Sequence, residues 1–312
     1  MFFATDVHGS EKCFLKFVNA PQAYKVNILI LGGDITGKMI VPIVKQSDGS
    51  CTAEFLGAKQ TLKSDQEIEE LEKRIRFTGY YPYRTDTEEM TAMKSDPIKV
   101  DAAFKQVMSD TLRRWMQIAE ERLKSKGVSI YVTGGNDDRM EIEDVLKNSS
   151  YVVDPEGELV TLDGDYEMIS SGWSNPTPWN TPRECSEEEL ERKLDSMIGK
   201  VKDMKRCIFN LHVPPYDTGL DTCPKLDENL KPVYAGPEIM MTAAGSKAVR
   251  SAIEKHQPIL GLHGHIHESR GFVKIGRTLC LNPGSEYTEG MLRGVVVELD
   301  GDRVRNYLLT VG

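Results

Sequence analysis

Residues 263–267 read His-Gly-His-Ile-His and follow directly on the short apolar run 259–262. Three of the six histidines in the chain therefore fall within five positions. Short apolar runs bounded by Gly or Pro, alternating with longer polar segments of helical period, are typical of an α/β fold with buried strands. The run 259–262 is one of these strands. The sequence thus predicts that three imidazoles lie at the carboxyl end of a buried strand.

Four other predicted strands end in the same way, with polar residues directly after an apolar run. These clusters are Asp-Val-His at 6–8, Gly-Gly-Asp at 32–34, Gly-Gly-Asn-Asp at 134–137, and Leu-His at 211–212. In open α/β sheets, ligands bind in the crevice outside the carboxyl ends of the strands. We therefore expect Asp, Asn and His side chains from five strand ends to meet at one edge of the fold.

The chemistry of these side chains favours divalent metal ions. Imidazoles together with carboxylates suit Mn, Fe, Ni or Zn, whereas an all-oxygen set would suit Mg or Ca. One carboxylate can bridge two cations, and a pair of cations ~3.5–4 Å apart is a clamp used in the displacement of phosphate esters. Seven candidate ligands are more than one ion needs, so we expect two divalent metals, with Mn as the first ion to test in vitro. The candidates are Asp6, His8, Asp34, Asn136, His212, His265 and His267.

In this order and on these predicted strands, the motifs resemble those of the calcineurin-like metallophosphoesterase superfamily. The five motifs are Asp6-x-His8, Gly33-Asp34, Gly135-Asn136-Asp137, His212 and Gly264-His265-x-His267. The turn Asn-Pro-Gly-Ser at 282–285 is also similar to one found in that family. The resemblance implies an α/β fold, specifically a four-layer α/β/β/α sandwich, formed by a single domain over 1–312.

The resemblance also implies an activity and a ligand arrangement. Asp6, His8 and His267 would bind one metal, Asn136, His212 and His265 the other, and Asp34 would bridge the two. A metal-bridging hydroxide would attack the phosphorus of a phosphomonoester or phosphodiester. The implied protein is a metal-dependent hydrolase, a phosphatase or phosphodiesterase, whose partner is a small-molecule phosphate ester.

One position departs from the family pattern. Many members have His after the motif Asn, where it contacts the phosphate or protonates the leaving group, but this chain has Asp137. An ionised carboxylate cannot donate a proton. Either Asp137 is protonated, or Asp138 or Arg139 reshapes the phosphate site. Arg139 could bind phosphate in a bidentate manner or form a surface salt bridge. We count Asp34, Asn136, His212, Asp137 and Arg139 as candidate catalytic residues.

The spacing of the last motif leaves its register open, because His263 and His265 have the same separation as His265 and His267. Gly264 precedes His265, and the family motif begins with such a glycine. The resemblance therefore favours His265 and His267 as the ligands. We expect His263 to pack beside them.

A long segment separates the second and third motifs. Asp34 and Asn136 are 102 residues apart, far more than one crossover helix requires. We predict an insertion over about 39–128 that is either a lid over the site or a surface elaboration. It is expected to contain a hairpin and a helix. Its predicted parts are strands at 39–45 and 51–56, a helix at 64–76, a loop at 80–83 and a long amphipathic helix at about 99–126.

The net charge and the absence of other catalytic motifs argue against further functional classes. With 39 Lys and Arg against 48 Asp and Glu, the net charge is −9, which argues against a nucleic-acid partner. A nuclease of the same superfamily and a non-catalytic interaction protein on the same fold stay as alternatives. The chain has neither a G-x-S-x-G elbow nor a G-x-x-x-x-G-K-[ST] phosphate loop.

The six cysteines show no C-x-x-C pair, which suits reduced thiols. No basic, apolar leader precedes the first strand. We therefore expect a cytoplasmic protein with no membrane partner. The sequence leaves a homo-oligomer open.

Overall fold

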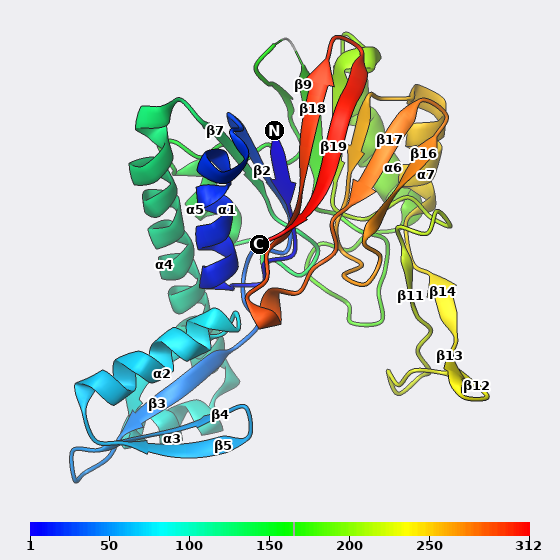
Figure 1. Ribbon diagram of the computed structural model, residues 1–312. Helices are drawn as coiled ribbons and strands as arrows, with labels where there is room; N and C mark the ends of the chain where they lie inside the picture. The colour runs from blue at the N-terminus through cyan, green and yellow to red at the C-terminus, as the bar shows by residue number, and fades with distance from the viewer. Residues whose placement is uncertain (165) are drawn as a thin grey trace.

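Two mixed sheets form the body of the protein in the computed structural model, which describes residues 1–164 and 166–312 (Figure 1). The first sheet has the order β19-β18-β1-β2-β7, in which β1, β2 and β7 are parallel. Its strands are β1 (Phe2–Ala4), β2 (Ile28–Gly32), β7 (Ser129–Thr133), β18 (Arg293–Asp300) and β19 (Arg303–Val311). β1 and β2 consist of apolar residues and glycine and are buried throughout, as expected of parallel strands with both faces covered.

The second sheet has the order β16-β17-β15-β10-β9-β8, and its four central strands are parallel. Its strands are β8 (Leu159–Thr161), β9 (Glu167–Ser171), β10 (Cys207–Leu211), β15 (Leu260–Leu262), β16 (Gly271–Ile275) and β17 (Thr278–Asn282). Phe3 of β1 and Ile30 of β2 belong to the same buried cluster as Ile208 of β10 and Leu260 of β15. This cluster shows that the two sheets pack against each other.

Helices cover the other side of each sheet. The first sheet packs against α1 (Glu11–Tyr24), α4 (Pro97–Leu123) and α5 (Ile142–Lys147). The second packs against α6 (Glu187–Ile198) and α7 (Lys247–His256). Short 3-10 turns lie at Lys124–Lys126, Met204–Arg206 and Tyr287–Glu289. The fold is thus a mixed α/β arrangement that is compatible with an α/β sandwich.

Residues 40–95 form a separate lobe below the body (Figure 1). The lobe has a sheet of order β5-β4-β3-β6 and a core of its own. Its elements are β3 (Ile40–Lys45), β4 (Cys51–Phe55), β5 (Ala58–Leu62), α2 (Asp65–Phe77), β6 (Tyr81–Asp86) and α3 (Thr87–Ser95). A full capping box at Ser64 and Glu67 begins α2, as the Ser-x-x-Glu spacing requires.

The sequence-based description of this segment as a hairpin plus a helix was incomplete. The loop predicted at 80–83 is wrong, because Tyr81 begins strand β6, which pairs in parallel with β3 despite Pro82. The interval predicted as one insertion, 39–128, contains two different parts. Trp115 of α4 stacks on Phe14 of α1 within the core of the body, at 4.2 Å between ring centroids, whereas the lobe has its own apolar cluster and joins the body core through Tyr81.

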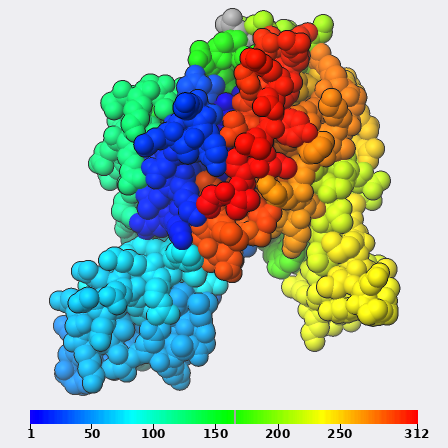
Figure 2. All heavy atoms as spheres, in the orientation of Figure 1, coloured from blue at the N-terminus to red at the C-terminus, as the bar shows by residue number. Residues whose placement is uncertain are grey.

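Two short ribbons form an arm that projects on the same side of the body as the lobe (Figure 2). The arm spans 222–243 and consists of β11 (Thr222–Pro224) paired with β14 (Met241–Ala243), and β12 (Tyr234–Ala235) paired with β13 (Glu238–Ile239). Among the described residues, no helix combines the length and apolar character needed to cross a membrane.

Candidate metal centre

Backbone hydrogen bonds join the loops at the strand ends to one another. The backbone N–H of Asp6 donates to the carbonyl of Gly33 and that of His8 donates to the carbonyl of Asp34, both at 2.9 Å. The N–H of Gly264 likewise donates to the carbonyl of His212 at 2.9 Å. These bonds continue the pairing of parallel strands beyond their ends, so the polar residues after each strand are held next to those after its neighbour.

Two groups of side chains, which share Asp34, could each hold a metal ion. The first consists of Asp6, His8, Asp34 and His267, and the second of Asp34, His212 and His265. Within each group the potential ligand atoms lie within 4.8 Å of one another. The structure therefore brings together six of the seven side chains that the sequence singled out.

The seventh candidate, Asn136, lies against the second group. Its Oδ1 atom is 3.1 Å from Nε2 of His212 and 2.7 Å from Nδ1 of His265. Its amide nitrogen points the other way and donates to Oγ1 of Thr181 at 2.9 Å. Thr181 in turn donates to Glu184 at 2.6 Å. Thr181 and Glu184 thus orient the amide of Asn136, a role that no spacing in the sequence signals.

The backbone is strained at four of the candidate ligands. Asp6, His8, Asp34 and His265 all have positive φ, between 39° and 66°. Such left-handed conformations are uncommon outside glycine and cost of order 1–3 kcal/mol each. They persist only where the surroundings fix them, and they cluster at functional sites. Here they turn the chain sharply at the end of each strand and aim the side chains at one another.

Two glycines allow the loops to approach closely enough. A Cβ on Gly264 would overlap Thr5 and Asp6, and a Cβ on Gly135 would overlap Asp34. Asn282, the last residue of β17 and the first of the Asn-Pro-Gly-Ser turn, donates to the carbonyls of Gly264 and Ile266 at 3.2 and 3.0 Å. The turn noticed in the sequence thus holds the histidine-rich loop in place.

The charges at the site favour a bound cation. Burial by itself would raise the pKa values of Asp34 and Asp6, but the neighbouring imidazoles outweigh it. The pKa of Asp6 falls to about 2, and that of Asp34 lies well below its usual range. Burial opposes a charge on His212, yet Asp34 and Asp6 raise its pKa to about 10. The two buried, ionised carboxylates of Asp6 and Asp34 therefore attract positive charge to the space between them.

The donor atoms also fit a divalent metal. Burial lowers the pKa of His8 to about 3 and that of His265 to about 4, so both imidazoles are neutral, as metal binding requires. Nε2 of His8 faces Nε2 of His267 at 3.1 Å, with Asp34 and Asp6 close by. Asp6 and Asp34 outweigh burial and raise the pKa of His267, so this imidazole holds a proton that a bound cation would displace.

The remaining candidates occupy different surroundings. Asp137 forms an ion pair with Lys38 at 2.5 Å and lies 4.0 Å from Nδ1 of His8. Arg139 instead pairs with Asp101 of α4 at 2.5 Å and with Glu141 at 3.8 Å. Within the described residues, Arg139 forms no ion pair with either Asp/His group. This contact corresponds to the salt-bridge interpretation of Arg139, and sequence reasoning did not identify Lys38 at all.

Asp138 and His263 are buried beside the centre. Asp138 accepts three backbone N–H bonds, from Gly135, Ile35 and Thr36, at 2.8 to 2.9 Å, together with the Thr36 hydroxyl. Nδ1 of His263 lies 2.8 Å from the carbonyl of Leu211, and its Nε2 atom finds no hydrogen-bond partner among the described residues. Asp138 therefore ties the loops after β2 and β7 together.

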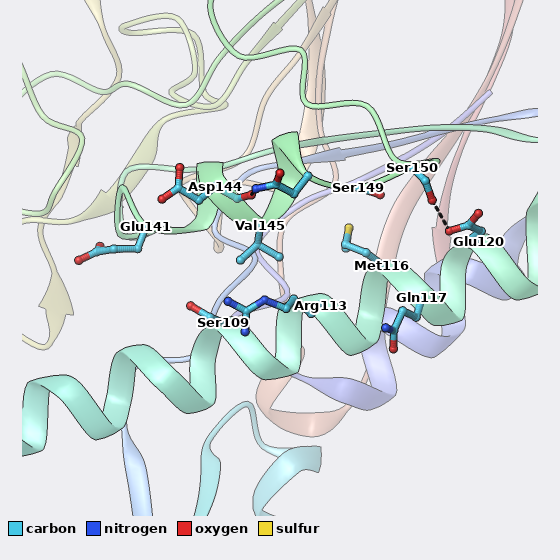
Figure 3. Close-up of a pocket in the computed structure, with 11 residues that line it drawn as sticks. Ser109, Arg113, Met116, Gln117, Glu120, Glu141, Asp144, Val145, Ser149 and Ser150 are labelled. Carbon is cyan, nitrogen blue, oxygen red and sulfur yellow. Dashed lines mark hydrogen bonds between the residues drawn. The ribbon is translucent and has the colours of Figure 1, made fainter.

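A groove of about 460 Å³ lies elsewhere, between α4 and α5 (Figure 3). Ser109, Arg113 and Met116 of α4 face Asp144 and Val145 of α5 across it. None of the described residues that line it belongs to the Asp/His groups. The candidate metal centre is therefore a separate feature of the structure.

Comparisons with known proteins support the fold. No family model matches the chain. An uncharacterized protein of Methanocaldococcus jannaschii, MJ1162, is 34% identical over 151 residues, a match that covers 48% of this chain. The chain spans only 61% of the length of that protein. One crystal structure aligns with a TM-score of 0.54 at 16% identity, over 94% of this chain and 93% of the other.

A second solved structure, that of TT1561 from Thermus thermophilus, aligns with a TM-score of 0.50 at 13% identity, over 94% of this chain and 92% of the other. At these levels of identity the likeness concerns the fold alone. Each alignment nevertheless covers 94% of this chain, so the likeness in fold is not confined to one part of it.

Proposed function

We propose that this chain is a binuclear metal-dependent phosphoesterase with the four-layer α/β/β/α sandwich of the calcineurin-like metallophosphoesterases. The observation that carries the proposal is the position of Asp34, whose Oδ2 atom lies 3.6 Å from Nε2 of His8 and 3.4 Å from Nε2 of His212. One carboxylate oxygen thus faces ligand atoms of both groups. This arrangement is expected of a bridging ligand between two cations.

The proposed ligand sets follow from these contacts. Asp6, His8 and His267 would hold one cation, His212, His265 and Asn136 the other, and Asp34 both. When bound, two divalent cations lower the pKa of a coordinated water and neutralise charge on the phosphate. Hydrolysis forms a bond between the water oxygen and phosphorus, breaks the bond from phosphorus to the leaving oxygen, and delivers a proton to that oxygen.

The chain's own residues fix the geometry of this reaction. The strained backbone at Asp6, His8, Asp34 and His265 aims the ligands before any metal arrives. Thr181 keeps Oδ1 of Asn136 directed at the histidines, and Asp138 holds the loops that carry Asp34 and Asn136. A preorganised site of this kind needs little rearrangement during turnover.

The test is parallel titration and kinetics. Metal-free protein is titrated with Mn²⁺ by calorimetry, and hydrolysis is then measured on p-nitrophenyl phosphate, its bis ester, cyclic nucleotides and nucleoside diphosphate esters. We expect close to two Mn²⁺ per chain and Mn-dependent hydrolysis of at least one ester. Absence of both would leave the non-catalytic interaction protein, and activity confined to DNA would indicate the nuclease.

A further inference from the structure

Lys38 occupies a fixed position between the lobe and the candidate metal centre. It directly precedes the lobe and follows Gly37, whose backbone N–H donates to the hydroxyl of Tyr81 at 2.7 Å. A Cβ on Gly37 would overlap the carbonyl of Gly79, and a Cβ on Gly79 would overlap the carbonyl of His8. A Cβ on Gly9 would also overlap the backbone of Gly37, so the backbone just before Lys38 is in direct contact with the loop that carries His8.

The Lys38 ammonium is the cation next to the site. Its Nζ atom lies 2.5 Å from Oδ2 of Asp137, and the same oxygen lies 4.0 Å from Nδ1 of His8. Among the described residues, no other lysine or arginine forms an ion pair with Asp6, Asp34 or Asp137. The side chain of Lys38 remains 51% exposed, so it is accessible from solvent.

We infer that Lys38 binds a phosphoryl oxygen of the substrate beside the metal centre, and that Asp137 is a positioning residue that holds the ammonium there. This inference rests on the proposed phosphoesterase function. A lysine ammonium has three N–H donors and a compact charge. Asp137 accepts one of them, which leaves two for the substrate. The position where relatives carry a histidine thus contributes through its neighbour rather than by giving up a proton.

Tyr287 limits where the phosphoryl group can lie. Its ring packs against that of His8 at 4.7 Å between centroids and lies edge-on to His267 at 6.0 Å. It therefore covers the imidazoles of the first group on one side. The phosphoryl group therefore has to lie on a face of these imidazoles that Tyr287 leaves open.

The test measures phosphate binding separately from catalysis. Lys38→Met removes the positive charge and Lys38→Arg keeps it. Asp137→Asn removes the carboxylate that forms the ion pair with Lys38. Lys45→Met, at the exposed end of β3 in the same lobe, is the matched control. For each variant, Mn²⁺ stoichiometry is measured by calorimetry, binding of inorganic phosphate to the Mn-loaded protein by ³¹P relaxation, and KM and kcat on the best ester.

We expect Lys38→Met to weaken phosphate binding and raise KM about ten-fold or more, as for the loss of a charged hydrogen bond. Its Mn²⁺ stoichiometry should equal that of the wild type. Lys38→Arg should recover most of the lost phosphate affinity. The phosphate affinity of Asp137→Asn should lie between those of Lys38→Met and Lys38→Arg. Lys45→Met should match the wild type.

Several outcomes would overturn the inference. Unchanged phosphate affinity and KM in Lys38→Met would remove any role for the ammonium, and loss of Mn²⁺ from that variant would make its role structural. If the wild type itself neither binds Mn²⁺ nor hydrolyses an ester, the proposed function fails. If the wild type binds Mn²⁺ and hydrolyses an ester, and Lys38→Met has the same phosphate affinity and KM, only the role of Lys38 is overturned.

Discussion

Oδ1 of Asp34 accepts a hydrogen bond from the backbone N–H of Asp137 at 2.9 Å. This bond fixes the plane of the carboxylate and leaves Oδ2 turned toward His8 and His212. The residue after the motif Asn thus orients the proposed bridging ligand through its backbone, whichever side chain it carries. Histidine and aspartate at position 137 are equivalent in this respect.

Asp34→Asn should therefore affect both proposed metals. The substitution removes the buried negative charge that the two groups share, so we expect weaker binding of both Mn²⁺ ions and at least a ten-fold loss of turnover. Calorimetry and ester hydrolysis measure the two effects. Asp110→Asn, on the exposed surface of α4, is the control. More than a tenth of wild-type turnover in Asp34→Asn would contradict a bridging role.

The three clustered histidines should respond differently to alanine. His265→Ala and His267→Ala each remove a proposed ligand, so each should lower Mn²⁺ affinity and turnover sharply. His263→Ala leaves the metal groups intact and opens a cavity, so it should lower the free energy of unfolding by ~2 kcal/mol while Mn²⁺ binding persists. Equal losses of Mn²⁺ in all three variants would show that the register is wrong.

Thr181→Val should weaken the second metal specifically. Valine has nearly the shape of threonine but cannot accept the amide N–H of Asn136, so the amide is free to turn. We expect a lower affinity for one Mn²⁺ and an unchanged affinity for the other, in the 10–100-fold range typical of groups that orient metal ligands. Two unchanged Mn²⁺ affinities would show that Thr181 does not orient Asn136.

Asp138→Asn tests the structural connection between the loops. An asparagine amide would direct N–H groups at backbone N–H donors that the carboxylate now satisfies. We expect the free energy of unfolding of the metal-free protein to fall by ~2 kcal/mol or more. Urea denaturation in EDTA gives the value, and Asp110→Asn should stay within ~0.5 kcal/mol of the wild type. A loss no larger than that of the control would contradict this role.

The sequence predicted much of the body and, within the lobe, β3, β4 and α2, but not β5, β6 or the arm at 222–243. The strands that lead to the motifs are continuous apolar runs, such as Ile28–Gly32, and their carboxyl ends can be located from the following Gly and Asp. In contrast, β6 contains a proline and polar residues, and its partner β3 begins 41 residues earlier in the chain. Its pairing depends on long-range contacts that no local pattern reveals.

At the candidate site, too, some residues could be predicted from the sequence and others could not. Asp6, His8 and the other strand-end residues were found because metal ligands have characteristic types and spacings. Lys38, Thr181 and Tyr287 contact Asp137, Asn136 and His8, respectively. These three residues lie in segments that contain no metal-ligand motif. The sequence left Arg139 with two alternatives, a phosphate contact or a surface salt bridge, and its side chain pairs with Asp101 of α4. Sequence proximity to a motif does not determine where a long side chain points.

The left-handed backbone at Asp6, His8, Asp34 and His265 has a consequence for substitutions at these positions. Aspartate, asparagine and histidine bind metals, and they are also the non-glycine residues most often found with positive φ. The backbone conformation and the proposed metal binding therefore favour the same amino acids at these four positions. A substitution at any of these positions therefore changes the local backbone preference as well as a proposed metal ligand.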